Sequence, residues 1–167
     1  MRYNLIRKMD IADGPGVRVS IFMQGCAFHC KNCFNKETWD FNLGIEFTDD
    51  TIKHVLELCD NDYITGLSIL GGEPLHPKNI DGSTKLAKEF KKKFKDKNLW
   101  VWSGFLFENL QDKEILKYID VLVDGQYVDE LHNPKLKWKG SSNQRVIDVQ
   151  KSLKKKDIVL YEKETTW

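Results

Sequence analysis

Three closely spaced cysteines, Cys26, Cys30 and Cys33, form the motif C-x₃-C-x₂-C. Thiolates this close together can bind three corners of an iron–sulfur cube and leave one iron without a protein ligand, whereas such clusters are usually held by four cysteines. An iron with an open position can bind a small molecule, as catalytic metal sites do. The spacing therefore predicts a [4Fe–4S] cluster that acts as a reagent rather than as an electron carrier.

A structural zinc site is the alternative that the cysteine spacing leaves open, with His29 or His54 as the fourth ligand. Zinc sites with three cysteines and one histidine exist, and the softness of the ligands does not separate zinc from iron–sulfur chemistry. His29 is the poorer candidate because it lies inside the loop and next to a ligand, Cys30. A zinc protein of this kind would be a binding module without catalysis, colourless and indifferent to oxygen.

A second candidate motif, Gly71-Gly72-Glu73-Pro74, follows a short apolar run at residues 67–70. Two glycines at the end of a strand allow the backbone to approach a ligand closely. Exposed carbonyl groups and the carboxylate of Glu73 could accept hydrogen bonds from an ammonium group. An ordinary turn explains the same residues, so this motif is specific only in combination with the cysteines.

Strands and helices alternate along the chain, which favours a mostly parallel α/β sheet. Strands are predicted at residues 17–23, 67–70, 99–102 and 121–123, with weaker ones at 145–149 and 158–161. Helices are predicted from Thr48 to Cys59 and at residues 83–94 and 108–118. A closed barrel of eight such units usually needs ~200 to 250 residues. We therefore expect the 167 residues to form one domain, an open partial barrel of about five to six βα units.

The candidate site residues share a position at the ends of predicted strands. In parallel α/β folds the site lies at the carboxyl ends of the strands. Cys26, Gly71, Ser103 and Asp124 each follow a predicted strand. Four separate features are therefore expected to meet at one rim of the sheet.

The composition excludes several classes of function. The formal net charge of +1 gives no signature of nucleic-acid binding. No apolar run is long enough to cross a membrane, and the N-terminus has no secretory signal, so a cytoplasmic protein is expected. The clustered cysteines also argue against a disulfide framework. Cys59, on the apolar side of a predicted helix, is interpreted as a small buried hydrophobic residue.

Together these motifs resemble the radical S-adenosylmethionine superfamily and, within it, the anaerobic ribonucleotide reductase-activating proteins. The resemblance extends from about Tyr3 to Val149. Besides the two motifs above, it is carried by residues 13–18 (DGPGVR), 33–35 (CFN), 75–77 (LHP), 100–105 (WVWSGF), 121–125 (VLVDG) and 138–144 (WKGSSNQ).

The resemblance implies a specific reaction. S-adenosylmethionine would chelate the open iron of the cluster, and one electron from the reduced cluster would cleave it to methionine and a 5′-deoxyadenosyl radical. That radical would remove a hydrogen atom from a glycine in the large subunit of the anaerobic reductase. The electron would come from an external donor such as flavodoxin, because the chain has no flavin or second cluster motif. A neighbouring alternative is a radical enzyme that acts on a small molecule.

The resemblance also implies roles for individual residues. Cys26, Cys30 and Cys33 would ligate the cluster, and Gly71, Gly72 and Glu73 would hold the amino group of the cosubstrate. Asn32 and Phe34, which flank Cys33, would face the adenine, although many superfamily members have an aromatic residue at the position of Asn32. Ser103 and Asp124 would contact the cosubstrate, and Asp124 alternatively a cation. Asn143 and Gln144 would contact the cosubstrate or the partner, or belong to a polar loop.

Two further features have open interpretations. Arg18 lies in a predicted strand between Val17 and Val19 and points to the face opposite theirs. It would either pair with a carboxylate inside the barrel or face solvent. The last residues, from Ser152 to Trp167, would either complete the sheet or form a tail.

Overall fold

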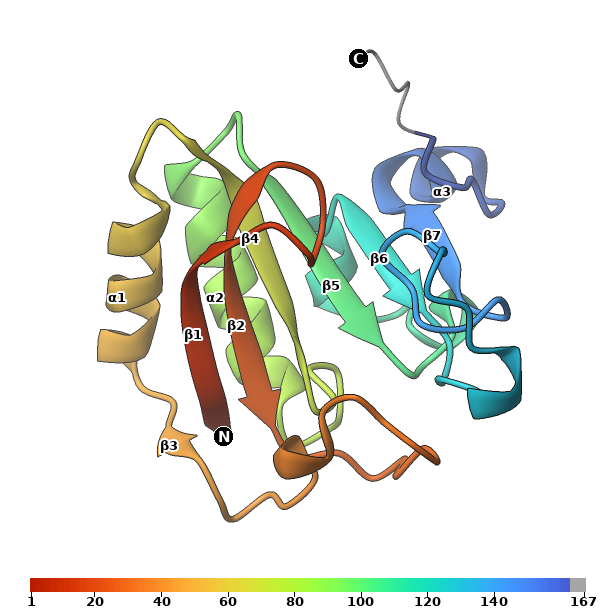
Figure 1. Cartoon of the computed structure of the whole chain (residues 1–167). Helices are drawn as coiled ribbons and strands as arrows, with labels where there is room; N and C mark the ends of the chain where they lie inside the picture. The colour runs from red at the N-terminus through yellow and green to blue at the C-terminus, as the bar shows by residue number, and fades with distance from the viewer. Residues whose placement is uncertain (163–167) are drawn as a thin grey trace.

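The structure, a computed structural model, describes residues 1–162 and is an α/β fold built on one seven-stranded sheet (Figure 1). The strand order is β3-β1-β2-β4-β5-β6-β7. The strands are β1 (Arg2–Asp10), β2 (Val17–Gln24), β3 (Ile45–Glu46), β4 (Ile64–Gly71), β5 (Asn98–Ser103), β6 (Val121–Asp124) and β7 (Arg145–Asp148). The helices are α1 (Asp49–Cys59), α2 (Ile80–Lys93) and α3 (Val149–Lys155). Short 3₁₀ turns are η1 (Lys36–Thr38), η2 (Phe107–Asn109), η3 (Glu114–Lys117) and η4 (Asp129–Leu131).

The sheet has a parallel centre and antiparallel margins. Strands β2, β4, β5 and β6 pair in parallel, whereas β1 pairs antiparallel with β2 and β3, and β7 pairs antiparallel with β6. The expectation of a mostly parallel sheet is therefore not supported. The reason is that β1 reaches β2 through the short connection at residues 11–16, and β7 returns to β6 through a loop without a crossover helix.

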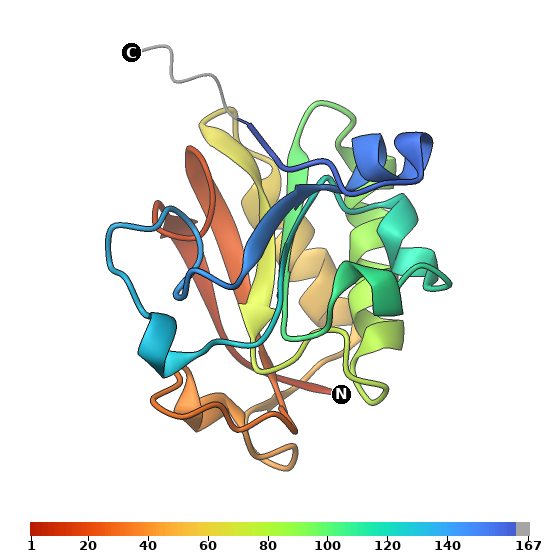
Figure 2. The ribbon, with the colours of Figure 1, turned by 90° about the vertical axis from the view of Figure 1, so that its right-hand side faces the viewer.

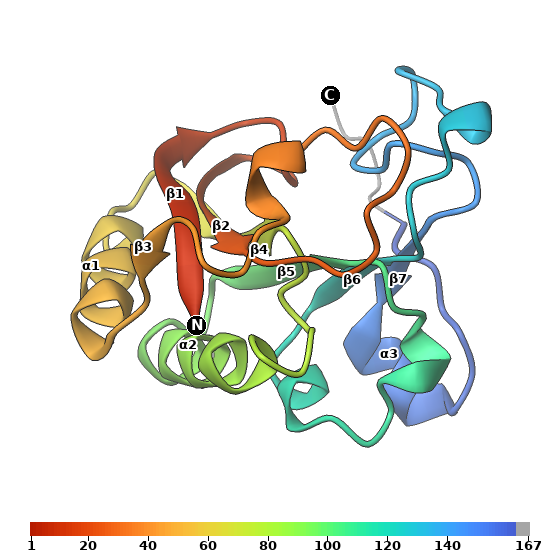
Figure 3. The same cartoon turned by 90° about the horizontal axis from the view of Figure 1, so that it is seen from below.

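Helices cover one face of the sheet and loops cover the other, as the view along the strands shows (Figure 3). Val19, Ile21 and Met23 are every second residue of β2, so their side chains all point toward the helical face, where they are completely buried in the main core. Helix α1 begins after Thr48, which forms a capping box with Thr51. The helix places Cys59 in the same core, which confirms its interpretation as a buried hydrophobic residue.

The opposite face carries a smaller aromatic cluster and the buried side chain of Arg18. Trp100, Val121 and Val123 form this cluster, with Trp138 and Tyr161 packed against it. Neither expected environment of Arg18 is found. Its guanidinium is fully buried, and its hydrogen-bond acceptors in the described residues are neutral groups rather than a carboxylate.

Several predicted elements differ from the structure. The predicted helix at residues 108–118 is replaced by the turns η2 and η3, because the backbone at Lys113 is extended and Phe107 N donates to Asp124 Oδ2. The predicted strand at 158–161 makes only an isolated bridge from Leu160 to Ile147. Of the segment that starts at Ser152, the first residues belong to α3, which had not been predicted, and residues 163–167 lie outside the described part. No helix within residues 1–162 is long and apolar enough to span a membrane.

Candidate iron–sulfur site

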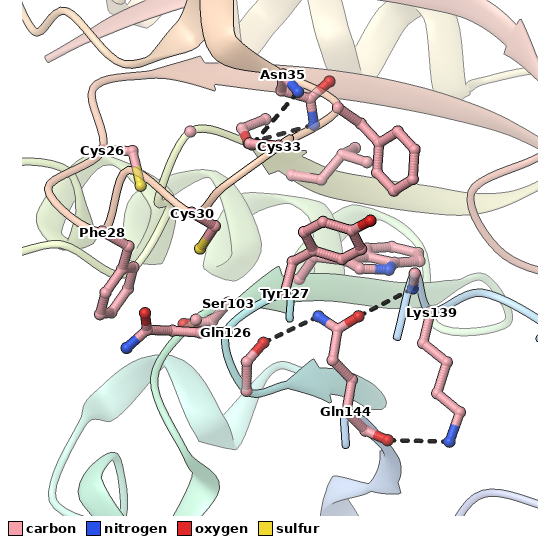
Figure 4. Close-up of a pocket in the computed structure, with 18 of the residues that line it drawn as sticks. Cys26, Phe28, Cys30, Cys33, Asn35, Ser103, Gln126, Tyr127, Lys139 and Gln144 are labelled. Carbon is pink, nitrogen blue, oxygen red and sulfur yellow. Dashed lines mark hydrogen bonds between the residues drawn. The ribbon is translucent and has the colours of Figure 1, made fainter. Parts of the chain in front are cut away.

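The cysteine motif and the Gly-Gly-Glu motif line one cavity of about 730 Å³ at the carboxyl ends of the parallel strands. This volume is within the range of pockets that bind drug-sized ligands. The lining includes all three cysteines of the motif and, from the other predicted site residues, Phe34, Gly71, Gly72, Glu73 and Ser103. Figure 4 shows Cys26 and Cys30 directed toward a shared space, opposite Ser103 and Gln126. The predicted convergence at one rim is therefore found for these residues.

Backbone hydrogen bonds join the cysteine loop (residues 25–35) to the Gly-Gly-Glu motif. Gly25 N donates to Thr38 O at 2.6 Å and Cys26 N donates to Trp39 O at 3.0 Å. From the other side, Glu73 N donates to Gly25 O at 2.8 Å. The start of the cysteine loop is thus held between η1 and the end of β4 by backbone hydrogen bonds.

Asn79 is a positioning residue that sequence reasoning missed. It immediately precedes α2, its exposed fraction is only 1%, and its side-chain Nδ2 donates to Gln24 O at 3.1 Å and Glu73 O at 3.0 Å. One amide group therefore links the residue before the cysteine loop to the Gly-Gly-Glu motif. Its position before a helix could have suggested a cap, but its side chain bonds to other segments.

Glycine is required at two successive positions, Gly71 at the end of β4 and Gly72 directly after it. Gly71 has a φ of +106°, a conformation that other residues rarely adopt. At Gly72, an added Cβ would lie 2.5 Å from Gly25 O and 2.9 Å from Thr38 O. Because these neighbours are backbone atoms within the hydrogen-bonded junction, they cannot move aside as a flexible side chain can.

The substitution Gly72→Ala is expected to reduce the free energy of unfolding by about 1–3 kcal/mol, because it overpacks this junction. Gly82→Ala is the matched control, since its Cβ would closely approach only the flexible end of Met1, with Phe47 at an ordinary contact distance of 3.5 Å, and alanine is favoured within α2. Urea unfolding of the two variants makes the comparison. Equal stability of both variants would contradict the account of the junction.

The carboxylate of Glu73 connects the ends of β4 and β5. Oε1 accepts hydrogen bonds from Ser103 Oγ at 2.8 Å and Leu75 N at 3.0 Å, and Oε2 accepts from Gly104 N at 2.7 Å. Burial raises the pKa of Glu73 to about 7, although these three hydrogen bonds act in the opposite direction. Ser103, predicted as a cosubstrate contact, lines the cavity while it donates to Glu73.

The pKa of Glu73 predicts a pH-dependent stability. Its value in the folded protein lies above the ordinary 4.5, so the folded state binds more protons than the unfolded state between these values. The contribution of Glu73 to the free energy of unfolding is therefore greatest below pH 4.5 and falls as the pH rises toward 7. Relative to Glu73→Gln, the free energy of unfolding of the wild-type protein should fall by about 3 kcal/mol between pH 4.5 and about pH 7. Urea unfolding of both proteins at both ends of the window tests this, and a constant difference would contradict it.

Two predicted site residues, Asp124 and Asn32, are not part of the cavity lining. Asp124 is completely buried, and its carboxylate accepts from Phe107 N at 2.8 Å and Arg145 Nε at 2.9 Å. The Asp124 carboxylate also forms an ion pair with Arg145. It is therefore bound to other parts of the fold and does not line the cavity. The Asn32 amide donates to Asp129 Oδ2 at 2.8 Å and does not line the cavity.

Phe34 and Gln144 take different positions around the opening. Phe34 is 65% exposed, and its ring centroid lies 5.2 Å from that of Tyr127. Gln144 Oε1 accepts from Gly140 N at 2.9 Å, and its Nε2 donates to Gly125 O at 2.9 Å (Figure 4). Asn143 donates to Gln126 O at 2.8 Å. Asn143 and Gln144 therefore close the base of a loop, and Gln144 also lines the cavity.

Comparison with known proteins identifies the family. The sequence profile described as "4Fe-4S single cluster domain" matches residues 12–147. The protein from Enterobacteria phage T4 named "Anaerobic ribonucleoside-triphosphate reductase-activating protein" is 40% identical over 146 residues, which is 87% of this chain and 93% of the phage protein. The chain belongs to the family of anaerobic ribonucleoside-triphosphate reductase-activating proteins. The family member from Escherichia coli is 37% identical over 150 residues, which is 87% of this chain and 97% of that protein. The member from Vibrio cholerae is 36% identical over 148 residues, which is 86% of this chain and 96% of that protein.

The donor atoms of this reductase-activating family member fit an iron–sulfur cluster. All three thiols are free and line the cavity, and Cys33 Sγ accepts a hydrogen bond from Asn35 N at 3.4 Å. Burial raises the pKa of the Cys26 and Cys30 thiols, so their thiolates need a nearby positive charge, which iron ions provide. The indole Nε1 of Trp39 is a buried donor with no acceptor among the described residues. It therefore remains available to a sulfur atom beside the cysteine loop.

His29, one of the two candidates for a fourth zinc ligand, has another partner in this reductase-activating family member. Zinc requires its ligands at ~2.0–2.3 Å from one ion. Among residues 1–162, no three or more His, Cys, Asp or Glu side chains, the three cysteines of the motif included, are grouped closely enough to hold a single metal ion. His29 instead stacks on Trp39, with ring centroids 4.4 Å apart and an interplanar angle of 16°.

Proposed function

We propose that this protein is a radical S-adenosylmethionine enzyme that activates the large subunit of an anaerobic ribonucleotide reductase by forming a glycyl radical there. The observation that carries the proposal is the shared cavity, which is lined by the three free thiols and by the Gly-Gly-Glu motif. The names of the relatives support the reductase as partner. The matched cluster-domain family supports the cofactor.

Cys26, Cys30 and Cys33 would hold a [4Fe–4S] cluster and leave one iron open. When bound, this cluster supplies an electron that cleaves S-adenosylmethionine to methionine and the 5′-deoxyadenosyl radical, which takes a hydrogen atom from a glycine. The chain itself binds and orients the cosubstrate and excludes water from it. In this proposal Gly71 and Gly72 provide backbone groups for its amino group, while Glu73 holds Ser103 and Gly104 at the cavity wall.

Phe34 and Ser103 complete the proposed binding site for S-adenosylmethionine. Both line the cavity, and the exposed ring of Phe34 offers a stacking surface for adenine. We do not include Asp124, because its carboxylate is occupied by Arg145 and Phe107. Asn32 is assigned a different role below.

The open architecture suits a protein substrate. A closed barrel would narrow the entrance to the cavity, whereas the open sheet leaves the loop side accessible, and we propose that it is a truncated βα barrel. A glycine suits the target position because it has no side chain to block the approach. The electron would come from an external one-electron donor such as flavodoxin.

The test is anaerobic reconstitution with iron and sulfide, followed by dithionite and S-adenosylmethionine and an assay for 5′-deoxyadenosine. The expected result is a brown protein that forms this product and, when mixed with the reductase, an organic radical visible by electron paramagnetic resonance. A colourless protein that retains zinc and forms no product would overturn the proposal. Product without a reductase radical would instead favour a small-molecule substrate.

A further inference from the structure

The loop that follows β6 reaches across the cavity to the cysteine loop. We call residues 126–140 the cover loop; it contains η4 and contributes Gln126, Tyr127 and His132 to the cavity lining. Figure 2 shows its η4 segment, in cyan, close to the cysteine loop, in orange. The two loops are about a hundred residues apart in the sequence, so their contact has to be maintained by specific side chains.

Asp129 is at the centre of this contact. Its Oδ2 accepts a hydrogen bond from Asn32 Nδ2 at 2.8 Å, and its Oδ1 accepts one from Tyr127 OH at 3.1 Å. Lys31 Nζ lies 3.9 Å from the same carboxylate and 3.3 Å from Glu130 Oε1. The hydrogen bond from Asn32 is the main reason why the pKa of Asp129 is lowered. Asp129 thus binds Asn32 and Lys31 of the cysteine loop and Tyr127 of its own loop.

Asn32 is also specially placed within the cysteine loop. It has a φ of +55°, a left-handed conformation that asparagine tolerates better than most residues. The turn around it is closed by a hydrogen bond from Cys33 N to Cys30 O at 3.1 Å. A change in the position of the Asn32 side chain therefore also changes the turn that carries the thiols of Cys30 and Cys33.

The cover loop is fixed at its base, so the contact with Asp129 determines the position of its far part. Gln144 binds both Gly125 and Gly140, and Gly125 has a φ of +96°. Between these anchors, the cover loop meets the cysteine loop through Asp129, through Glu130 and through aromatic contacts of Phe34. Of these contacts, the hydrogen bond between Asn32 and Asp129 is short and involves a charged acceptor, which makes it the strongest.

We propose that Asp129 is a positioning residue for the reaction: by holding Asn32, it fixes the turn between Cys30 and Cys33 against the cover loop and holds these two walls of the cavity together around S-adenosylmethionine. The identity of this ligand rests on the function proposed above. The role of Asp129 in joining the two loops does not depend on it.

The test exchanges the two partners of the hydrogen bond. Asn32→Asp places two carboxylates together and should separate the loops, whereas the double variant Asn32→Asp with Asp129→Asn restores an amide–carboxylate pair with its direction reversed. Glu130→Gln is the matched control, because Glu130 lies on the same turn, binds only Lys31 among the described side chains and is absent from the cavity lining.

Hydrogen exchange of the protein without iron gives the first readout. Amides of residues 126–140 and 27–35 should exchange at least about tenfold faster in Asn32→Asp, the size expected for one charge-assisted hydrogen bond. The double variant should return to the wild-type rate, and Glu130→Gln should remain there. In reconstituted protein, Asn32→Asp should raise the KM for S-adenosylmethionine about tenfold with a smaller change in kcat, and the double variant should reverse this.

Any of three results would overturn the role of Asp129: unchanged exchange in Asn32→Asp, failure of the double variant to restore the wild-type exchange rate, or an equal effect of Glu130→Gln. Cleavage of S-adenosylmethionine by the wild-type protein would then still support the proposed function. If no protein cleaves S-adenosylmethionine but exchange responds as expected, the proposed function and the KM part of the inference fail, and the link between the loops stands.

Discussion

Cys30→Ala is expected to produce a folded protein that holds no cluster and cleaves S-adenosylmethionine at a rate reduced by more than about 100-fold. Removal of an outer partner of a metal ligand already costs ~10–100-fold, and loss of a ligand exceeds this. The fold should survive because Cys30 is only partly buried and lies in a loop outside the main core. Iron and sulfide content, visible absorbance and 5′-deoxyadenosine formation measure the site, and circular dichroism measures the fold.

Cys59→Ala is the matched control, since it also removes one thiol. Cys59 is completely buried in the main core and belongs to α1, so its loss should reduce stability modestly and leave iron content and cleavage unchanged. Full activity in Cys30→Ala, or loss of the cluster in Cys59→Ala, would show that the cluster ligands have been wrongly assigned.

Arg18→Met is expected to reduce the free energy of unfolding by about 3 kcal/mol, because each buried neutral group that loses its hydrogen-bond partner costs about 1–3 kcal/mol. The guanidinium donates to Ser68 Oγ and Asn98 Oδ1 at 2.7 Å and to Leu67 O at 2.9 Å. Methionine retains most of the volume but leaves these buried acceptors without their donor. Burial also lowers the pKa of Arg18 to about 10, which shows how strongly the site is desolvated.

Lys85→Met provides the comparison for Arg18. The Lys85 side chain is 56% exposed and forms an ion pair at 2.6 Å with Asp49, whose side chain is 82% exposed. Exposed pairs of this kind contribute at most about 1 kcal/mol. Urea unfolding should therefore separate the two variants clearly, and a similar small loss in both would mean that the hydrogen bonds of Arg18 contribute little.

The central strands could be predicted because each is a short apolar run that ends in a polar or glycine-rich turn. Alternation of Val17, Val19, Ile21 and Met23 indicated β2, and Thr48 with two acids indicated the start of α1. Strand β1 was missed because its exposed and half-buried residues do not alternate clearly. Its position in the sheet depends on pairing with β2 and β3, which a local pattern does not reveal.

The cavity lining was predicted where a residue type was required by chemistry or by close backbone contact, as for the cysteines, Gly71 and Gly72. Other roles depend on distant partners. Asp124 follows a strand as expected, but its acceptor capacity is taken by Arg145, which lies 21 residues away. Asn32 is separated by 97 residues from Asp129. Such pairs form only when the fold brings them together, so spacing within a motif cannot predict them.

The margins of the sheet have a consequence for how a protein partner can bind. At one margin, the outer side of β7 is occupied by hydrogen bonds from Asp148 N to Val159 O and from Tyr161 N to Val146 O. The margin at β3 differs, because β3 has only two residues and pairs with the first two residues of β1 alone, so the rest of the outer side of β1 has no strand partner among the described residues. A partner that adds its own strand can therefore do so along β1 and not at β7. At β7 a partner has to recognise this protein through side chains and loops, and the same hydrogen bonds protect that margin from joining edge to edge with other copies.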